Sequence, residues 1–228
     1  MNPTIMANWF DRYSRTHFHD WTVSQLNLQP YQHVLEVGCG SGQLLAIVAR
    51  TLRIGFLAGI ESSIPLYQQA YRRNKAFIHQ QFIQLHLGEL HELPYPAHYF
   101  HTIYKSGVHS PGKNGIHSPG KNAVTECLRL ASLLRSGGRL VWLSQAATYR
   151  KQEDLRTEAA RLQAACLTAG LTDIRTSYRD FPSGPGMAVT GIKPDADLWI
   201  DPEPNRAINN RLLNPKPHFI SKIARMQM

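Results

Sequence analysis

The sequence has few acidic residues, few cysteines and no long apolar run. No stretch approaches the roughly 18 apolar residues of a membrane-spanning helix, and residues 1–21 contain no apolar core of signal-peptide length. Cys39, Cys127 and Cys166 lie far apart and form no C-x-x-C pair, which argues against a disulfide framework or a zinc site. We therefore expect a cytoplasmic protein without a transmembrane segment and without a metal site.

The shortage of acidic residues leaves a strongly basic chain. Lysine and arginine number 25 against 16 aspartates and glutamates, which gives a formal net charge of +9. Such a charge suits nucleic acid, an anionic membrane surface or an acidic small molecule. Residues 105–122 and 204–228 contain basic residues and no acid. Because charge runs are usually solvated, we interpret them first as an exposed loop and a surface tail.

Short apolar strands alternate with amphipathic helices over most of the chain. Strands are predicted at 33–37, 56–60, 82–87, 101–104 and 139–143, and helices at 43–52, from Pro65 onward, at 123–135 and at 154–169. This alternation predicts an α/β fold, a doubly wound and mostly parallel sheet with helices on both faces. In such a sheet, ligands bind at the carboxyl ends of the strands.

The last two predicted strands, 173–178 and 187–192, differ from the others. They are separated by a segment containing FPSGPG, which is too short for a crossover helix, so they should form an antiparallel hairpin. The sheet would then have seven strands with a reversed last strand. We expect three parts: an aromatic-rich helical cap or lid at 1–29, the main domain at 30–193, and a basic, proline-rich tail at 194–228.

The stretch VLEVGCGSG, residues 34–42, predicts a strand, a tight turn and a helix. Glycines permit backbone angles closed to other residues and let a ligand approach the main chain, while the first helical turn offers free N–H groups. Glu61 follows about 20 residues later, as in nucleotide-binding units. A dinucleotide fingerprint needs its third glycine at position 43, where this chain has Gln43, so a dinucleotide enzyme is the weaker alternative.

Residues 30–192 resemble the class I S-adenosylmethionine-dependent methyltransferases, especially the small-molecule group (methyltransferase type 11) that includes ubiquinone and menaquinone methyltransferases. VLEVGCGSG is similar to the family's E/D-x-G-x-G-x-G motif, and LLRSGGRLV, from Leu133, is similar to its L-K-P-G-G-x-L turn. Gly88-Glu89-Leu90 is similar to its G-D-A segment, with Glu89 replacing the usual aspartate. The resemblance implies a Rossmann-like class I fold, S-adenosylmethionine as methyl donor and S-adenosylhomocysteine as product.

The resemblance also implies how the cofactor is bound. Glu61 would accept the ribose hydroxyls, the glycine turn would lie along the methionine part, and Glu36 would orient the turn or, through water, the ammonium. Glu89 and Leu90 would border the adenine. The expected cofactor-binding residues are Tyr13, Glu36, Gly38, Cys39, Gly40, Gly42, Glu61, Ser62, Gly88, Glu89, Leu90 and Lys105. The alternative for Glu61 is a solvated carboxylate at a helix start.

A tandem repeat follows the fourth predicted strand: GVHSPGKN at 107–114 recurs as GIHSPGKN at 115–122. Two copies of eight residues cannot stack into a solenoid, so we expect a duplicated loop. The resemblance places a histidine-containing segment here, which makes His109 or His117 a candidate general base, while nearby lysines could receive an anionic substrate. The alternative is a lid whose histidines do no chemistry.

The sequence thus predicts an enzyme that methylates an unidentified, small-molecule acceptor. An RNA (rRNA or tRNA) methyltransferase is the first alternative because of the +9 charge. Against it, Tyr104-Lys105-Ser106-Gly107 lacks the Asn/Asp-Pro-Pro-Tyr/Phe element of many enzymes that methylate base amines, and we recognise no appended RNA-binding module. A catalytically silent cofactor-binding or assembly module is the alternative of another class.

Overall fold

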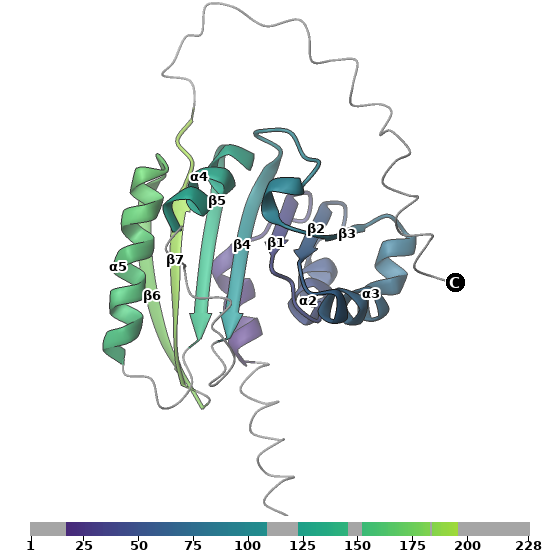
Figure 1. The fold of residues 1–228 in the computed structure, drawn as a ribbon, viewed down its shortest axis with the longest axis horizontal. Helices are drawn as coiled ribbons and strands as arrows, with labels where there is room; N and C mark the ends of the chain where they lie inside the picture. The colour runs from purple at the N-terminus through teal and green to yellow at the C-terminus, as the bar shows by residue number, and fades with distance from the viewer. Residues whose placement is uncertain (1–16, 109–122, 146–151, 183, 196–228) are drawn as a thin grey trace, which may run out of the picture. The chain divides into compact units, whose positions relative to one another are not determined.

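The computed structural model describes residues 17–108, 123–145, 152–182 and 184–195 (Figure 1). The chain divides into two units, Met1–Asp195 and Ala196–Met228. The second unit, residues 1–16 and residues 109–122 lie outside the described part. The predictions for Tyr13, His109, His117 and the basic tail therefore concern residues outside it.

Strands and helices alternate along the described chain as the sequence predicts. The strands are β1 (His33–Val37), β2 (Phe56–Glu61), β3 (Ile83–Leu87), β4 (Phe100–Val108), β5 (Leu134–Gln145), β6 (Thr172–Phe181) and β7 (Gly184–Ile192). The helices are α2 (Gln43–Thr51), α3 (Ile64–His79), the short 3-10 helix η1 (Leu90–Glu92), α4 (Ala123–Leu133) and α5 (Gln152–Thr168). A further helical segment, residues 17–26, precedes β1.

These strands form one sheet in the order β3-β2-β1-β4-β5-β7-β6. Strands β1 to β5 are parallel, and β7 runs antiparallel to both β5 and β6. The predicted doubly wound sheet and closing hairpin are thus confirmed. The chain moves outward from β1 to β3 and then returns to β4 on the other side of β1. α/β proteins bind ligands in the crevice at such a reversal of strand order. Here that crevice lies above the carboxyl ends of β1 and β4.

Helices cover both faces of the sheet, and each face has its own apolar core. On one face, α2 and residues 17–26 pack on side chains such as Val34 and Leu143. On the other, α4 and α5 pack on Leu35, Ile103 and Trp142. In the helical segment 17–26, Phe18 and Trp21 are buried against Phe181, with ring centroids 5.5 Å from it. This segment is therefore part of the core, and its predicted role as a lid over a ligand stays a prediction.

The junction between α4 and β5 differs from the predicted one. The helix was predicted to reach Arg135, but α4 ends at Leu133 and β5 begins at Leu134. Leu134 pairs with Phe100, and the next pair joins Arg139 to Thr102, so residues 135–138 form a bulge. The ammonium of Lys193 donates to the carbonyls of Ala131 and Leu134 at 2.8 and 2.9 Å and so caps the end of α4. A contact from residue 193 could not be predicted from the local pattern.

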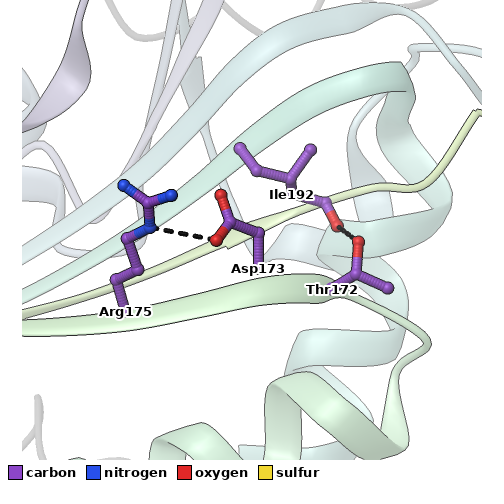
Figure 2. Close-up of polar contacts among 4 residues, drawn as sticks. All are labelled: Thr172, Asp173, Arg175 and Ile192. Atoms are coloured by element: carbon purple, nitrogen blue, oxygen red, sulfur yellow. Dashed lines mark hydrogen bonds and ion pairs between the residues drawn. The ribbon is translucent and has the colours of Figure 1, made fainter.

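Strand β6 forms one edge of the sheet and carries exposed charges. At its start, Asp173 has a φ of 48°, a conformation that aspartate tolerates better than most residues, and its carboxylate accepts a hydrogen bond from Arg175 at 2.9 Å (Figure 2). The Thr172 hydroxyl donates to the Ile192 carbonyl at 3.3 Å. Such an exposed ion pair stabilises little, but charges on an edge strand oppose edge-to-edge pairing between molecules.

Candidate functional site

The glycine turn between β1 and α2 lies at the reversal of strand order. Gly40 and Gly42 have φ of 56° and 71°, values in the left-handed region. A Cβ built on Gly40 would meet no atom within 4 Å, so this residue presents bare backbone to open space. A Cβ on Gly42 would lie 2.5 Å from the Asn74 amide nitrogen and 2.8 Å from the Ala70 Cα. Gly40 is therefore the glycine open to a ligand, and Gly42 is required for packing.

Helix α3 holds the turn through two side chains that sequence reasoning missed. The buried Asn74 amide donates to the carbonyls of Gly42 and Ala70 at 3.0 and 2.9 Å. Arg73 donates to the Ser41 carbonyl and hydroxyl at 2.6 and 2.7 Å. A polar pair on an amphipathic helix normally indicates a solvated face, so the sequence carries no local signal for this role.

Three backbone amides of the turn are used inside the protein. The N–H groups of Gly38 and Cys39 both donate to the Ile60 carbonyl, at 2.9 and 3.0 Å, and the Gly42 N–H donates to the Cys39 carbonyl at 2.9 Å. The first two bonds tie the turn to the end of β2, and the third closes the turn itself. Contacts from Gly38 and Cys39 to a ligand would therefore use atoms other than these amides. The Cys39 side chain is buried, and burial raises the pKa of its thiol.

Glu61 ends β2 and is 5% exposed, with its carboxylate directed at the turn. One oxygen accepts the Gly40 N–H at 2.8 Å, and the other accepts the Ser63 N–H at 2.8 Å. Hydrogen bonds to an ionised acceptor are among the stronger ones, so this carboxylate is held firmly. Because a carboxylate has about four acceptor positions, Glu61 retains capacity for hydroxyl donors on a ligand. Ser62, the next residue, is exposed.

Glu36, on β1, forms a buried pair with Tyr104 on β4. The two residues are register partners in adjacent parallel strands, and the Tyr104 hydroxyl donates to the Glu36 carboxyl at 2.9 Å. Burial raises the pKa of Glu36 to about 8; the Tyr104 hydrogen bond opposes this rise and the nearby Glu61 adds to it. Burial likewise raises the pKa of Tyr104 well above its usual value. Glu36 is therefore mostly protonated near neutral pH.

The adenine-side residues lie directly after β3. The Gly88 N–H donates to the Glu61 carbonyl at 3.0 Å, which joins this segment to the end of β2. Glu89 is exposed, and it forms a capping box with Glu92: each side chain accepts the backbone N–H of the other residue. Leu90 is partly buried against the core. The carboxylate of Glu89 is thus engaged in capping η1, and its role toward adenine stays a prediction.

Lys105 belongs to a different cluster from the turn. Its ammonium is 2.6 Å from the Glu126 carboxylate and 4.7 Å from the centre of the Trp142 ring, which belongs to the core cluster that packs on α4 and α5. The neighbouring residue in β4, Tyr104, belongs to the core cluster of the other face. Neighbouring strand residues point to opposite faces, so the structure does not bring Lys105 together with Glu36. A cofactor contact from Lys105 stays a prediction.

Neither a metal site nor a membrane-spanning helix is found in the described residues. Within the described ranges, no group of three His, Cys, Asp or Glu side chains is placed to hold a metal ion. No helix in the same ranges is both long and apolar enough to cross a membrane.

Comparison with known proteins finds similarity to methyltransferases. The profile of the protein-L-isoaspartate(D-aspartate) O-methyltransferase family matches residues 4–91. A demethylmenaquinone methyltransferase from Symbiobacterium thermophilum is 29% identical over 152 residues, which cover 66% of this chain and 55% of the relative. The chain thus spans about half the length of that curated relative. In these comparisons the chain is similar to class I S-adenosylmethionine-dependent methyltransferases.

Solved structures of methyltransferases have the same fold. A SAM-dependent methyltransferase from Aquifex aeolicus superposes with a TM-score of 0.59 at 14% identity, covering 85% of this chain and 99% of that chain. A Haemonchus contortus phosphoethanolamine methyltransferase, solved with S-adenosylhomocysteine and phosphomonomethylethanolamine, has a TM-score of 0.61 at 10% identity, covering 78% and 53%. The predicted class I fold is therefore confirmed.

The family profile covers the part of this chain that contains the glycine turn. Residues 4–91 include β1, β2 and β3 and hence Glu36, Gly40 and Glu61. The profile ends before β4 and before the duplicated octad. The match therefore includes the glycine turn and does not include β4 or the duplicated octad.

Proposed function

We propose that this chain transfers the methyl group of S-adenosylmethionine to a small-molecule acceptor and releases S-adenosylhomocysteine. The observation that carries the proposal is the bare, left-handed backbone of Gly40 beside the fixed carboxylate of Glu61. A ligand with a ribose and an amino-acid arm fits this arrangement, because it needs a hydroxyl acceptor and a main chain that it can approach closely. Bound there, S-adenosylmethionine supplies an activated methyl group on a sulfonium.

Each residue of the site would contribute to cofactor binding in a different way. Glu61 would accept the ribose hydroxyls through the acceptor positions that its two backbone hydrogen bonds leave open. Gly40 would let the cofactor lie against the turn. Arg73 and Asn74 would act indirectly, because they fix the turn in the shape that the cofactor meets. Preorganisation of this kind lowers the entropic cost of binding.

The chemical step needs the acceptor atom in line with the methyl group, so positioning and exclusion of water carry much of the rate. A base is required only when the acceptor must lose a proton. We propose His109 or His117 for that role, since the octad follows β4 and β4 ends at the crevice. The two copies are nearly identical, so the sequence does not distinguish the two histidines.

The names of the similar proteins support a small-molecule acceptor. The Symbiobacterium relative is a demethylmenaquinone methyltransferase, and the Haemonchus structure contains a small phosphorylated amine. An anionic acceptor suits a chain of net charge +9. The same charge is the feature that favours RNA, and the profile match raises a protein carboxyl group as a further acceptor.

Transfer of a labelled methyl group from S-adenosylmethionine tests the proposal. The acceptors are a panel of small quinols, amines and phosphorylated amines, with total RNA and an isoaspartyl peptide as the competing classes. Label in a small molecule supports the proposal, while label in RNA or peptide alone contradicts the acceptor class. Binding of cofactor with no transfer to any acceptor indicates the silent module. The double variant His109→Ala with His117→Ala tests the base: full turnover eliminates it.

A cytoplasmic location belongs to the same proposal. Three buried free cysteines support it, because free thiols are usual in a reducing compartment. Fractionation of cells that express the tagged full chain tests it; recovery of the protein outside the cytoplasm contradicts it.

A further inference from the structure

The amino ends of the parallel strands carry basic residues and no acid, at the end of the sheet opposite the arrowheads of β4 and β5 in Figure 1. The segments that lead into these five strands each contain arginine or histidine and no aspartate or glutamate: 27–33, 50–57, 79–83, 97–101 and 134–139. Two aspartates lie beyond them, Asp195 near Gly137 and Asp173 paired with Arg175. This end of the sheet should therefore attract an anionic partner.

Two large apolar side chains are exposed side by side at this end. Tyr31 is 57% exposed and Ile54 is 80% exposed. The Ile54 N–H donates to the Pro30 carbonyl at 3.1 Å, which places Ile54 opposite Tyr31 in continuation of the register of β1 and β2. Stabilisation of a helix end explains a basic residue such as Arg50, in the last turn of α2, but it does not explain adjacent apolar groups in water. Adjoining exposed apolar groups with a polar rim are typical of an interaction site.

Partly exposed rings continue this surface from β1 to β4. The Tyr31 ring is 6.0 Å from the His101 ring, which is 5.5 Å from the His33 ring. The His33 ring in turn is 4.9 Å from the Tyr99 ring. Beyond His101, the exposed Arg135 guanidinium contacts the His101 Nε2 atom at 2.7 Å. Rings on which bases can stack, next to a guanidinium that can pair with a phosphate, are the combination that binds single-stranded nucleic acids.

We propose that this end of the sheet binds a single-stranded nucleic acid through the amino-edge surface, which we define as Tyr31, His33, Ile54, Tyr99, His101 and Arg135. Tyr31 stacks on a base, and Arg135 pairs with a phosphate. An anionic bilayer fits less well, because phenol and imidazole groups interrupt the apolar area that insertion requires.

The amino-edge surface is separate from the candidate cofactor site. The glycine turn follows the other end of β1, roughly 13 Å along the strand from His33. A strand bound at the amino edge therefore does not need to enter the crevice or to accept a methyl group. The inference goes beyond the proposed function and does not depend on it.

Fluorescence anisotropy of the full chain with a labelled, mixed-sequence RNA of roughly 12 nucleotides tests the inference, and DNA of the same sequence distinguishes the two kinds of strand. Tyr31→Ala should weaken binding about five-fold or more and leave the salt dependence unchanged, because stacking is lost and no charge is removed. Tyr178→Ala, at an exposed position on β6, is the matched control and should leave the affinity unchanged. Circular dichroism checks that each variant is folded.

Arg135→Gln provides the second, independent arm. Loss of one phosphate contact should reduce the slope of log affinity against log salt concentration by about 0.7, the value for a single strand. Arg161→Gln removes the same charge from an exposed position on α5 and should leave the slope unchanged. A residue with only a structural role would not change this slope.

Four results would overturn the inference. The wild type fails to bind either oligonucleotide, or it binds phosphatidylglycerol vesicles and no oligonucleotide. Alternatively, Tyr31→Ala loses no more affinity than Tyr178→Ala, or the slope of Arg135→Gln equals that of Arg161→Gln. Each of these leaves the proposed function standing, because methyl transfer is measured separately. Failure of the wild type to bind S-adenosylhomocysteine overturns the proposed function and leaves this inference standing.

Discussion

The Asn74 amide nitrogen lies 3.0 Å from the Gly42 carbonyl, and only 2.5 Å from where a Cβ on Gly42 would be. Asn74 thus joins α3 to the start of α2 and leaves no room for a side chain on Gly42. Gly40, two residues earlier, has the same backbone handedness and open space around it. We therefore expect Gly42 to matter for folding and Gly40 for ligand binding.

Gly42→Ala should destabilise the fold, because the methyl group meets Asn74 and Ala70 and the backbone is left-handed. Overpacking and an unfavourable φ together cost about 3 kcal/mol of unfolding free energy. Gly40→Ala should cost only about 1 kcal/mol but weaken cofactor binding at least about ten-fold. Urea unfolding and calorimetry measure the two effects. Similar unfolding losses for both variants would contradict the division of roles.

Glu61→Gln should weaken S-adenosylhomocysteine binding by roughly ten- to a hundred-fold, since hydrogen bonds to an ionised acceptor contribute about 1.5–3 kcal/mol. Asp180→Asn is the control, because Asp180 is an exposed acid on the edge strand β6. It should change affinity by less than about three-fold. The same loss in both variants would show that net charge, and not the placement of Glu61, governs binding.

Stability should depend on pH through Glu36. Its folded pKa, about 8, is above the ordinary value of 4.5, so the folded state binds more protons between these limits. The stabilisation is therefore complete below about pH 4.5 and is lost as pH rises through about 8, by a few kcal/mol in total. In urea unfolding of the ligand-free protein, Glu36→Gln should remove this decline, because glutamine cannot ionise. An identical pH profile for the two proteins would contradict the protonated state.

Lys193→Met should destabilise the fold by about 2 kcal/mol. The Lys193 ammonium donates to two carbonyls at the junction of α4 and β5 and contacts His98 at 3.1 Å. Lys75→Met, at an exposed position on α3, is the control and should stay within about 0.5 kcal/mol of the wild type. Thermal unfolding compares the two. A loss at Lys193 no larger than that at Lys75 would show that the cap is not stabilising.

Much of the fold could be predicted because its signals are local. Alternating strand and helix periods, the glycine spacing and the short link between the last strands each lie within a few residues. The sheet has the predicted parallel strands and closing hairpin. The end of α4 was predicted too late, since Lys193, far along the chain, caps it.

The site was less predictable because its polar contacts join distant segments. Tyr104 meets Glu36 only through the register of β1 and β4, a separation of 68 residues. Arg73 and Asn74 reach the turn across 32 residues. A one-residue change of register in β4 would place Lys105 beside Glu36 instead of Tyr104. The types of residue at the turn could be predicted, whereas the partners that fix them required the tertiary structure.

The most direct test of the central claim is equilibrium binding of S-adenosylmethionine to the full chain, with NAD as the competing ligand. We predict saturable, one-to-one binding of S-adenosylmethionine that weakens at least about ten-fold in both Gly40→Ala and Glu61→Gln. We expect no competition from NAD. Tight binding of NAD without binding of S-adenosylmethionine would contradict the account, as would S-adenosylmethionine affinity unchanged in both variants.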